Sequence, residues 1–155
     1  MSRQSVDRIL EVCDVVGRTE DCEIHITGGE PLLLENRDLV EYILERASEE
    51  KYTIGITTNG YTLEEYTPLL RKYHQIINRI NVSIDGGDPV QLKRRRLKSG
   101  KAYSVEKIIE GIRGIADLTQ VFTNTLVDQE NLSQIRDILN FLKNKGRILT
   151  AACIF

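Results

Sequence analysis

The sequence predicts an α/β fold in which strands and helices alternate around a parallel sheet. Short runs rich in β-branched residues, which favour strands, alternate with segments whose apolar residues recur at helical spacing. Alternation of this kind produces a parallel sheet with right-handed crossovers. Three of the apolar runs end in a polar sequence that contains glycine, and ligands on parallel sheets bind beyond the carboxyl ends of the strands.

The first two helices and strands follow from spacing and composition. Apolar residues at positions 6, 9, 10, 13 and 16 predict a helix over 6–16, and a short strand follows at 23–27. Apolar residues at positions 40, 43, 44 and 47 form one face of a second helix. The run 52–58 is rich in β-branched residues and is predicted to be the second strand.

Capping residues locate the starts of the next two helices. Thr62 and Glu65 have the spacing of a capping box, which predicts a third helix over 62–73 before a strand at 80–84. Ser104 can cap a fourth helix that runs to about residue 115, because its side chain can accept a hydrogen bond from the first turn.

The last part of the chain repeats the alternation. A strand is predicted at 120–127, and a helix over 131–142 follows, which Asn131 and Gln134 would cap. The final apolar run, 148–155, is the fifth predicted strand. The long segment 86–103 carries no predicted element, and loops of this length in compact domains are often functional.

Composition limits the class of protein. The chain has 155 residues, of which 41% are hydrophobic and 28% charged, so we expect one globular domain over residues 1–155. The net charge of −2 argues against nucleic acid and against an anionic membrane surface as partners. No apolar run approaches the roughly 20 residues of a membrane helix. Three scattered cysteines argue against a disulfide framework and for a reducing cytoplasm.

A tight acidic turn, Gly28-Gly29-Glu30-Pro31, follows the first predicted strand. The two glycines let the backbone adopt unusual dihedral angles and approach a ligand closely, and Pro31 stiffens the exit. The Glu30 carboxylate could accept a hydrogen bond from an ammonium group. Glycine and proline are also common turn residues, so the motif alone is equally consistent with a plain strand-to-helix turn.

Two further strand ends carry polar side chains. The sequence Thr-Thr-Asn-Gly at 57–60 offers hydroxyls and an amide, although Asn-Gly is also a common turn pair. Ser83 and Asp85 are two residues apart in a predicted strand and therefore share a face. A hydroxyl and a carboxylate on one face suit sugar hydroxyls, but Asp85 and Gly86 could equally serve to turn the chain.

Basic and aromatic residues give weaker signals. The run Arg94–Arg96 is typical of a solvated basic face, although a guanidinium folded back could clamp a carboxylate bidentately. His25 is expected to be packed or hydrogen-bonded rather than a ligand, and Phe122 is expected to be a packing residue. The sequence shows neither a recognisable nucleophile–base pair nor the spacing of metal-binding residues.

Taken in order, these motifs resemble the radical S-adenosylmethionine (radical SAM) superfamily. Ile-Thr-Gly-Gly-Glu-Pro-Leu resembles its second-strand motif, and Thr-Asn-Gly resembles its third-strand end. Val-Ser-Ile-Asp-Gly, followed about a dozen residues later by an arginine, is similar to the subgroup of peptide-maturing and sulfatase-maturing members. The match spans nearly the whole chain and implies a partial, incomplete TIM-like barrel of six βα units, of which this chain would hold about five.

The resemblance also implies roles for individual residues. In the family, the backbone and acidic residue of the first motif hold the methionine ammonium of S-adenosylmethionine. The serine and the arginine contact the cofactor, and the arginine takes its carboxylate; the matching arginine is Arg95 by spacing, with Arg94 or Arg96 as alternatives. The implied cofactor-binding set is Gly28, Gly29, Glu30, Pro31, Thr58, Asn59, Ser83, Asp85 and Arg95.

One defining feature of the family is absent from the sequence. The family's Cys-x3-Cys-x2-Cys motif supplies three thiolates to a 4Fe-4S cluster and leaves the fourth iron open for the cofactor. Cys13, Cys22 and Cys153 cannot replace it by spacing. We therefore expect this chain to be a portion of a longer enzyme, without the first barrel strand, and expect the cluster only in the full-length protein.

The implied reaction is reductive cleavage of S-adenosylmethionine, followed by hydrogen abstraction from a peptide or protein substrate. Without cluster ligands, the chain alone is expected to be catalytically silent. The alternative is a non-catalytic half-barrel that binds a nucleotide-like ligand or a partner peptide. The missing first strand would leave an exposed sheet edge, which could take such a peptide or promote self-association.

Overall fold

The sheet is parallel and its strands follow chain order. The computed structural model describes residues 1–16, 23–88, 91, 104–129, 131–134, 136–137, 140 and 149–154. Within them, one five-stranded sheet has the order β1-β2-β3-β4-β5, and every neighbouring pair is parallel. The strands are β1 (Glu23–Ile26), β2 (Thr53–Thr58), β3 (Ile77–Ser83), β4 (Gln120–Val127) and β5 (Leu149–Ile154). The predicted α/β fold with an open parallel sheet is confirmed.

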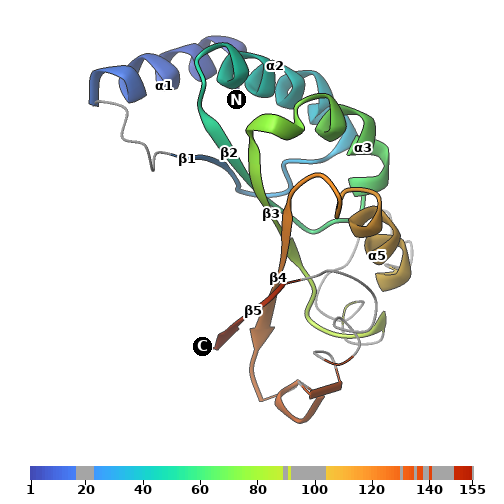
Figure 1. Ribbon diagram of the computed structural model, residues 1–155. Helices are drawn as coiled ribbons and strands as arrows, with labels where there is room; N and C mark the ends of the chain where they lie inside the picture. The colour runs from blue at the N-terminus through green and yellow to red at the C-terminus, as the bar shows by residue number, and fades with distance from the viewer. Residues whose placement is uncertain are drawn as a thin grey trace.

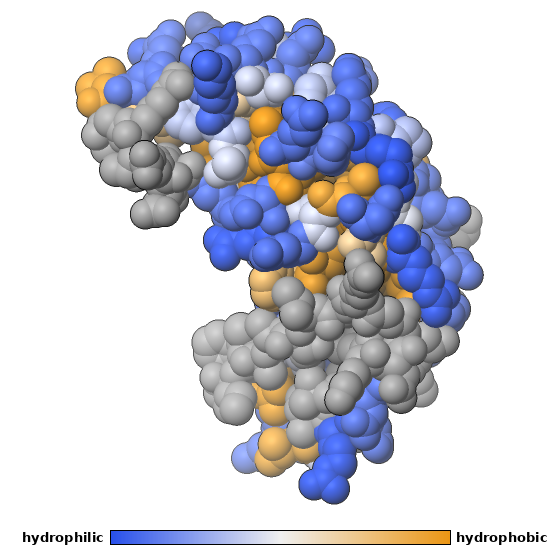
Figure 2. Space-filling model, viewed as in Figure 1, coloured by the Kyte–Doolittle hydropathy of each residue, from blue (hydrophilic) through white to orange (hydrophobic). Residues whose placement is uncertain are grey.

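The helices cover one face of this sheet. They are α1 (Arg3–Val16), α2 (Arg37–Glu49), α3 (Leu63–Lys72) and α5 (Val105–Arg113), with 3-10 turns η1 (Leu34–Asn36), η2 (His74–Ile76) and η3 (Leu132–Gln134). Figure 1 shows the four helices along the convex side of a sheet that curves but does not close. In the space-filling view the molecule is a crescent whose helix side is largely hydrophilic (Figure 2).

Burial alternates along the strands, as it must when only one face of a sheet is covered. On the helix side, Ile54, Ile56 and Ile80 are fully buried. The opposite face, called the open face below, carries more polar and more exposed side chains at the alternate positions. Its residues are Glu23, His25, Thr57, Arg79, Asn81, Ser83, Phe122 and Asn124.

Local capping was predicted with mixed success. Ser104 caps α5 as expected, because its Oγ accepts from the Lys107 N–H at 3.4 Å. The capping box at Thr62 is wrong: Thr62 precedes α3 but makes no side-chain cap bond, and its hydroxyl donates to the Leu32 carbonyl instead. The local pattern does not reveal this acceptor, because Leu32 is 30 residues away in the sequence.

Two other boundaries differ from the prediction. Strand β3 begins at Ile77, three residues before the expected start, because Ile77 and Arg79 pair with Ile54 and Gly55 of β2, with a register shift that leaves Asn78 without a β2 partner. The side chain of Asn131 bonds to β4 and to the end of β3 rather than capping a helix. Most of the predicted helix over 131–142 and most of the segment 86–103 lie outside the described residues. Among the described helices, none is both long and apolar enough to cross a membrane.

Candidate functional site

The turn after β1 is open to solvent on its glycine side. Gly28 has a φ of +94° and Gly29 a φ of +53°, a region that side chains with a Cβ rarely adopt. A Cβ added at either position would meet no atom within 4 Å. The glycines are therefore required by the backbone conformation, and the space in front of this backbone stays free for a ligand.

Glu30 ties this turn to the end of β2. Its Oε1 accepts from the Leu32 N–H at 3.0 Å and from the Thr58 hydroxyl at 2.6 Å. Its Oε2 accepts from the Asn59 N–H at 2.6 Å. The carboxylate is half-buried, and with these three donors it closes the β1 turn onto the neighbouring strand end.

The segment after Glu30 is held just as firmly. Asn36 Nδ2 donates to the carbonyls of Glu30, at 3.2 Å, and of the buried Pro31, at 3.3 Å. The Tyr66 hydroxyl, from α3, donates to the Leu33 carbonyl at 2.8 Å. Burial raises the pKa of Tyr66 to about 12, so this donor keeps its proton throughout the physiological range.

The end of β2 is a tight Asn-Gly turn whose side chains serve the turn itself. Thr58 is buried, and its Oγ1 accepts from the Gly60 N–H at 3.0 Å, while Asn59 Oδ1 accepts from the Tyr61 N–H at 2.9 Å. Gly60 has a φ of +78°, and a Cβ there would lie 2.6 Å from Val82 Cγ1. Glycine is thus demanded here both by the backbone and by packing.

The end of β3 separates two residues that the sequence grouped together. Ser83 lies half-buried on the open face, and its hydroxyl has no hydrogen bond among the described residues. Asp85 is only 2% exposed, and its Oδ1 accepts from the Leu126 N–H of β4 at 3.0 Å. Ser83 and Asp85 were expected to share one face of the strand, and this prediction is wrong. Asp85 lies beyond the end of β3, and its side chain turns toward β4.

Two buried amides near Asp85 were missed as site residues. Gln91 Oε1 accepts from the Asp85 N–H at 2.8 Å, and its Nε2 donates to the Ser83 carbonyl at 3.3 Å. Asn131 Nδ2 donates to the Asp85 carbonyl at 3.1 Å and to the Leu126 carbonyl at 2.7 Å. Both side chains are fully buried. Asn131 leaves no local signal, since it meets Asp85 across 46 residues of sequence, whereas Gln91 is six residues from Asp85 but falls in the segment 86–103, which carries no predicted element.

Together, the described site residues form a row of strand ends at one edge of the sheet. Glu30 links the ends of β1 and β2, and Asp85 links the ends of β3 and β4. Between them lie the open Gly28-Gly29 backbone and the Ser83 hydroxyl, which has no hydrogen-bond partner in the part of the chain that the structure describes. Arg95, with its alternatives Arg94 and Arg96, lies outside the described residues.

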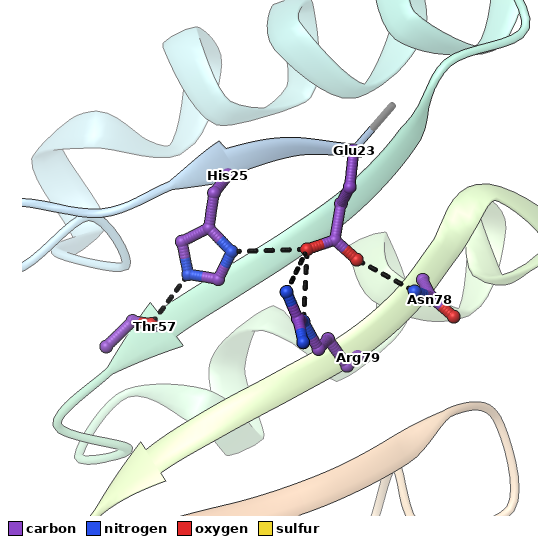
Figure 3. A network of polar contacts seen from close by, with 5 residues as sticks. All are labelled: Glu23, His25, Thr57, Asn78 and Arg79. Carbon is purple, nitrogen blue, oxygen red and sulfur yellow. Dashed lines mark hydrogen bonds and ion pairs between the residues drawn. The ribbon is translucent and has the colours of Figure 1, made fainter. Parts of the chain in front are cut away.

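A second polar cluster lies on the open face, nearer the amino ends of β1 and β3. Glu23 contacts His25, Asn78 and Arg79, and His25 also hydrogen-bonds to Thr57 through Nε2 at 2.7 Å (Figure 3). Burial opposes ionisation of Glu23, but its hydrogen bonds to Asn78, Arg79 and His25 outweigh burial and lower the pKa of its carboxyl group. The prediction that His25 is hydrogen-bonded is confirmed.

The described residues do not fit an iron–sulfur cluster. No group of three His, Cys, Asp or Glu side chains in the described part of the chain could hold a metal ion. Cys13 is a half-buried free thiol on α1. The sequence also lacks the Cys-x3-Cys-x2-Cys spacing that supplies three thiolates to a 4Fe-4S cluster.

Comparison with curated proteins finds relatives named for a nucleotide reaction. The chain is 36% identical over 129 residues to a probable GTP 3′,8-cyclase of Methanocaldococcus jannaschii, covering 82% of this chain and 41% of the relative. It is 34% identical over 153 residues to a probable GTP 3′,8-cyclase of Archaeoglobus fulgidus, covering 97% of this chain and 48% of the relative. The chain thus spans less than half the length of these relatives.

Comparison with solved structures supports the fold. A structure of native anSMEcpe with bound AdoMet matches with a TM-score of 0.74 and 17% sequence identity, over 98% of this chain and 41% of that one. At this identity the match shows the fold alone.

The expected peptide or protein substrate is a wrong prediction. The relatives found by sequence are named for GTP, a nucleotide, and so belong to a different subgroup from the peptide maturases. The motif Val-Ser-Ile-Asp-Gly suggested the maturase subgroup, but the sequence relatives show that this strand end does not identify the substrate.

The superfamily assignment, in contrast, rests on nearly the whole chain. The family model of the radical SAM superfamily matches residues 2–142. This range includes the Gly28–Pro31 turn, the Asn59-Gly60 turn and Ser83, in the order that the motifs predicted. The chain therefore belongs to the radical SAM superfamily.

Proposed function

We propose that residues 1–155 form one partial radical SAM domain that holds S-adenosylmethionine for a larger enzyme. The single observation that carries this proposal is the row of strand ends, in which an open glycine backbone and a serine hydroxyl without a partner among the described residues lie beside hydrogen-bonded neighbours. S-adenosylmethionine, when bound, supplies the 5′-deoxyadenosyl radical that abstracts a hydrogen atom from substrate. The chain's own residues bind and orient it.

The turn after β1 would hold the methionine ammonium group. A carboxylate offers about four lone-pair positions, and Glu30 uses three of them for Leu32, Thr58 and Asn59. One position remains for an ammonium donor beside the open Gly28-Gly29 backbone. The three internal bonds fix the carboxylate in place, which reduces the entropy that binding would otherwise cost.

Ser83 would contact the ligand directly, whereas several other members of the set would hold the strand ends in position. Thr58, Asn59 and Asp85 spend side-chain atoms on hydrogen bonds to turns or to neighbouring strands. We propose that they position the strand ends rather than touch the cofactor. Pro31 has the same role, because it is buried behind the turn. Arg95 is kept as the proposed partner of the ligand carboxylate.

A purine nucleotide is the substrate class that we propose for the whole enzyme. The support is the name of the relatives, GTP 3′,8-cyclase, together with at least 34% identity in the two relatives described above. The remainder of the enzyme would supply the cluster and the other part of the barrel.

Calorimetry with S-adenosylmethionine tests the cofactor part of the proposal. We expect the chain to bind it, and we expect Ser83→Ala to weaken binding about five- to tenfold, the effect of one lost hydrogen bond of roughly 1 kcal/mol. Ser48→Ala, an exposed position on α2, is the matched control and should bind like the unmodified chain. Absence of binding at millimolar ligand, or equal affinities for the two variants, would contradict the proposal.

A further inference from the structure

All formal charge on the sheet belongs to one ion pair. The five strands contain a single acidic residue, Glu23 in β1, and a single Lys or Arg, Arg79 in β3. Both side chains lie on the open face and point toward each other (Figure 3). This face is the concave side of the curved sheet, opposite the four helices (Figure 1), so its charge bears directly on which ligands the sheet can bind.

The pair is well made and held from several sides. Arg79 donates to Glu23 Oε1 from Nε at 3.0 Å and from Nη2 at 2.8 Å. Asn78 Nδ2 donates to Glu23 Oε2 at 2.8 Å, and His25 Nδ1 lies 3.4 Å from Oε1. The Glu23 side chain is only 13% exposed, whereas Arg79 is 48% exposed. Glu23 is thus held by three side chains, and Arg79 is the partner that still reaches solvent.

A glycine makes this pairing possible. Glu23 and Arg79 lie on β1 and β3, which are separated by β2, and they meet above Gly55. A Cβ at Gly55 would overlap Glu23 Oε1 and lie 2.5 Å from His25 Nδ1, a separation that real Cβ atoms essentially never show. Any larger residue at position 55 would push the carboxylate away from the guanidinium.

The paired charges make this wall a poor site for phosphate. Proteins bind phosphate with unpaired cations, above all with arginine, whose planar fork contacts two oxygens. Here the fork of Arg79 already faces a carboxylate, which would also repel an incoming phosphate. None of the five strands supplies another Lys or Arg to offset it.

Neutral hydrogen-bonding groups occupy the rest of the open face. Asn81 is half-buried, lies opposite Thr57 on β2 and opposite Phe122 on β4, and makes no side-chain hydrogen bond among the described residues. A carboxamide presents a donor and an acceptor side by side, the arrangement that pairs with a purine edge. Phe122, also half-buried, adds an aromatic ring at the same level of the sheet.

We propose that the wall formed by β1–β4 binds the uncharged nucleoside part of a purine substrate, and that the Glu23–Arg79 pair excludes phosphate from it. This inference rests on the proposed function, because it specifies which part of the nucleotide faces this sheet. Any phosphate groups of the substrate lie away from this wall. Glu23, Arg79 and Gly55 together are specificity determinants, and Asn81 is the residue that contacts the base or ribose.

Two-dimensional amide NMR on the chain, titrated with guanosine and with GTP at one fixed salt concentration, tests the proposal. We expect both ligands to shift the amide signals of Gly55, Thr57 and Asn81, with dissociation constants that agree within about threefold. Glu23→Gln releases the guanidinium and should change the ratio of the two affinities about tenfold in favour of GTP, the effect expected for a new charge-assisted hydrogen bond. Glu45→Gln, the same change at an exposed position on α2, should leave the ratio as it is.

A second variant keeps the test decisive if Glu23→Gln fails to fold. Arg79→Gln leaves the carboxylate unpaired and should make GTP bind more weakly than guanosine. The proposal is overturned if the unmodified chain binds GTP more than tenfold tighter than guanosine and Arg79→Gln removes that preference, or if neither ligand shifts these signals. S-adenosylmethionine, titrated separately, reports on Gly28, Gly29 and Ser83, so failure of the cofactor site is distinguished from failure of this wall.

Discussion

The turn after β1 and the turn after β3 use the same device with different outcomes. Each has a carboxylate that reaches across to the next strand: Glu30 to the end of β2, and Asp85 to β4. Glu30 remains half-buried beside glycines that have free space in front of them. Asp85 is 2% exposed and is bonded through its backbone to two buried amides, Gln91 and Asn131.

The comparison teaches that an acidic residue in a strand-end motif need not face the ligand. Both turns read alike in sequence, as a glycine beside a carboxylate after an apolar run. What separates them is whether the remaining lone pairs are reachable from the open face. By that criterion, we propose that the turn after β1 is a binding element and that the turn after β3 has a structural role and positions Ser83.

Removal of the Asp85 carboxylate should have the largest effect on stability. Asp85→Ala leaves the Leu126 N–H without its acceptor at a buried position, and we expect a loss of about 3 kcal/mol in the free energy of unfolding. Urea denaturation measures it. Asp85→Asn keeps an acceptor oxygen and should cost clearly less; equal losses for the two variants would show that the Leu126 bond is not what matters.

Replacement of Glu30 should cost less stability but should weaken cofactor binding. Three groups donate hydrogen bonds to the Glu30 carboxylate, and in Glu30→Gln the new NH2 group would face one of these donors. We therefore expect about 2 kcal/mol of destabilisation. Affinity for S-adenosylmethionine should fall by at least tenfold at a temperature where the variant is folded. Asp85→Asn, if folded, should bind the cofactor nearly normally, and a loss as large as that of Glu30→Gln would remove the distinction between the two turns.

Glycine substitutions test the difference between the two turns with a smaller expected change in the free energy of unfolding. Gly28→Ala forces a residue with a Cβ into a φ of +94°, which we expect to cost about 1 kcal/mol although no atom is in the way. Gly87→Ala in the other turn, where φ lies outside the left-handed region and no atom lies within 4 Å, should be nearly neutral. Thermal unfolding of the two variants measures the difference, and equal midpoints would contradict it.

Substitution of Glu23, at the start of β1, should give the smallest change in the free energy of unfolding. It serves as a reference for the substitutions in the two turns. Its pKa is lowered in the folded chain, so its stabilisation is present above the unfolded value of about 4.5 and is lost as pH falls through the folded value. The difference in unfolding free energy between the unmodified chain and Glu23→Gln should be below about 1 kcal/mol near pH 7, because its partner Arg79 is half-exposed. Urea denaturation from pH 7 to pH 3 should show this difference shrinking, and a difference that grows on acidification would reverse the assignment.

Much of the fold was predictable because the relevant signals are local. Apolar spacing and runs of β-branched residues predicted the α/β alternation and the approximate positions of all five strands, although β3 begins three residues earlier than expected. The order of the strands in the sheet came from the structure. Ser104 was found as a cap because the bond that it makes spans only three residues. Thr62 was misjudged because its hydroxyl bonds to Leu32, thirty residues earlier, and a distant acceptor leaves no trace in a local pattern.

The sequence by itself determined the family, the order of the strand-end motifs and the residues that carry them. Only the tertiary structure decided which side chains remain free, since Asn131 meets Asp85 across 46 residues and Glu23 meets Arg79 across 56. It also decided that Gly55 leaves room for that ion pair. The physical reason is that apolar periodicity is set by neighbours along the chain, whereas each polar atom takes whichever partner the fold brings within about 3 Å.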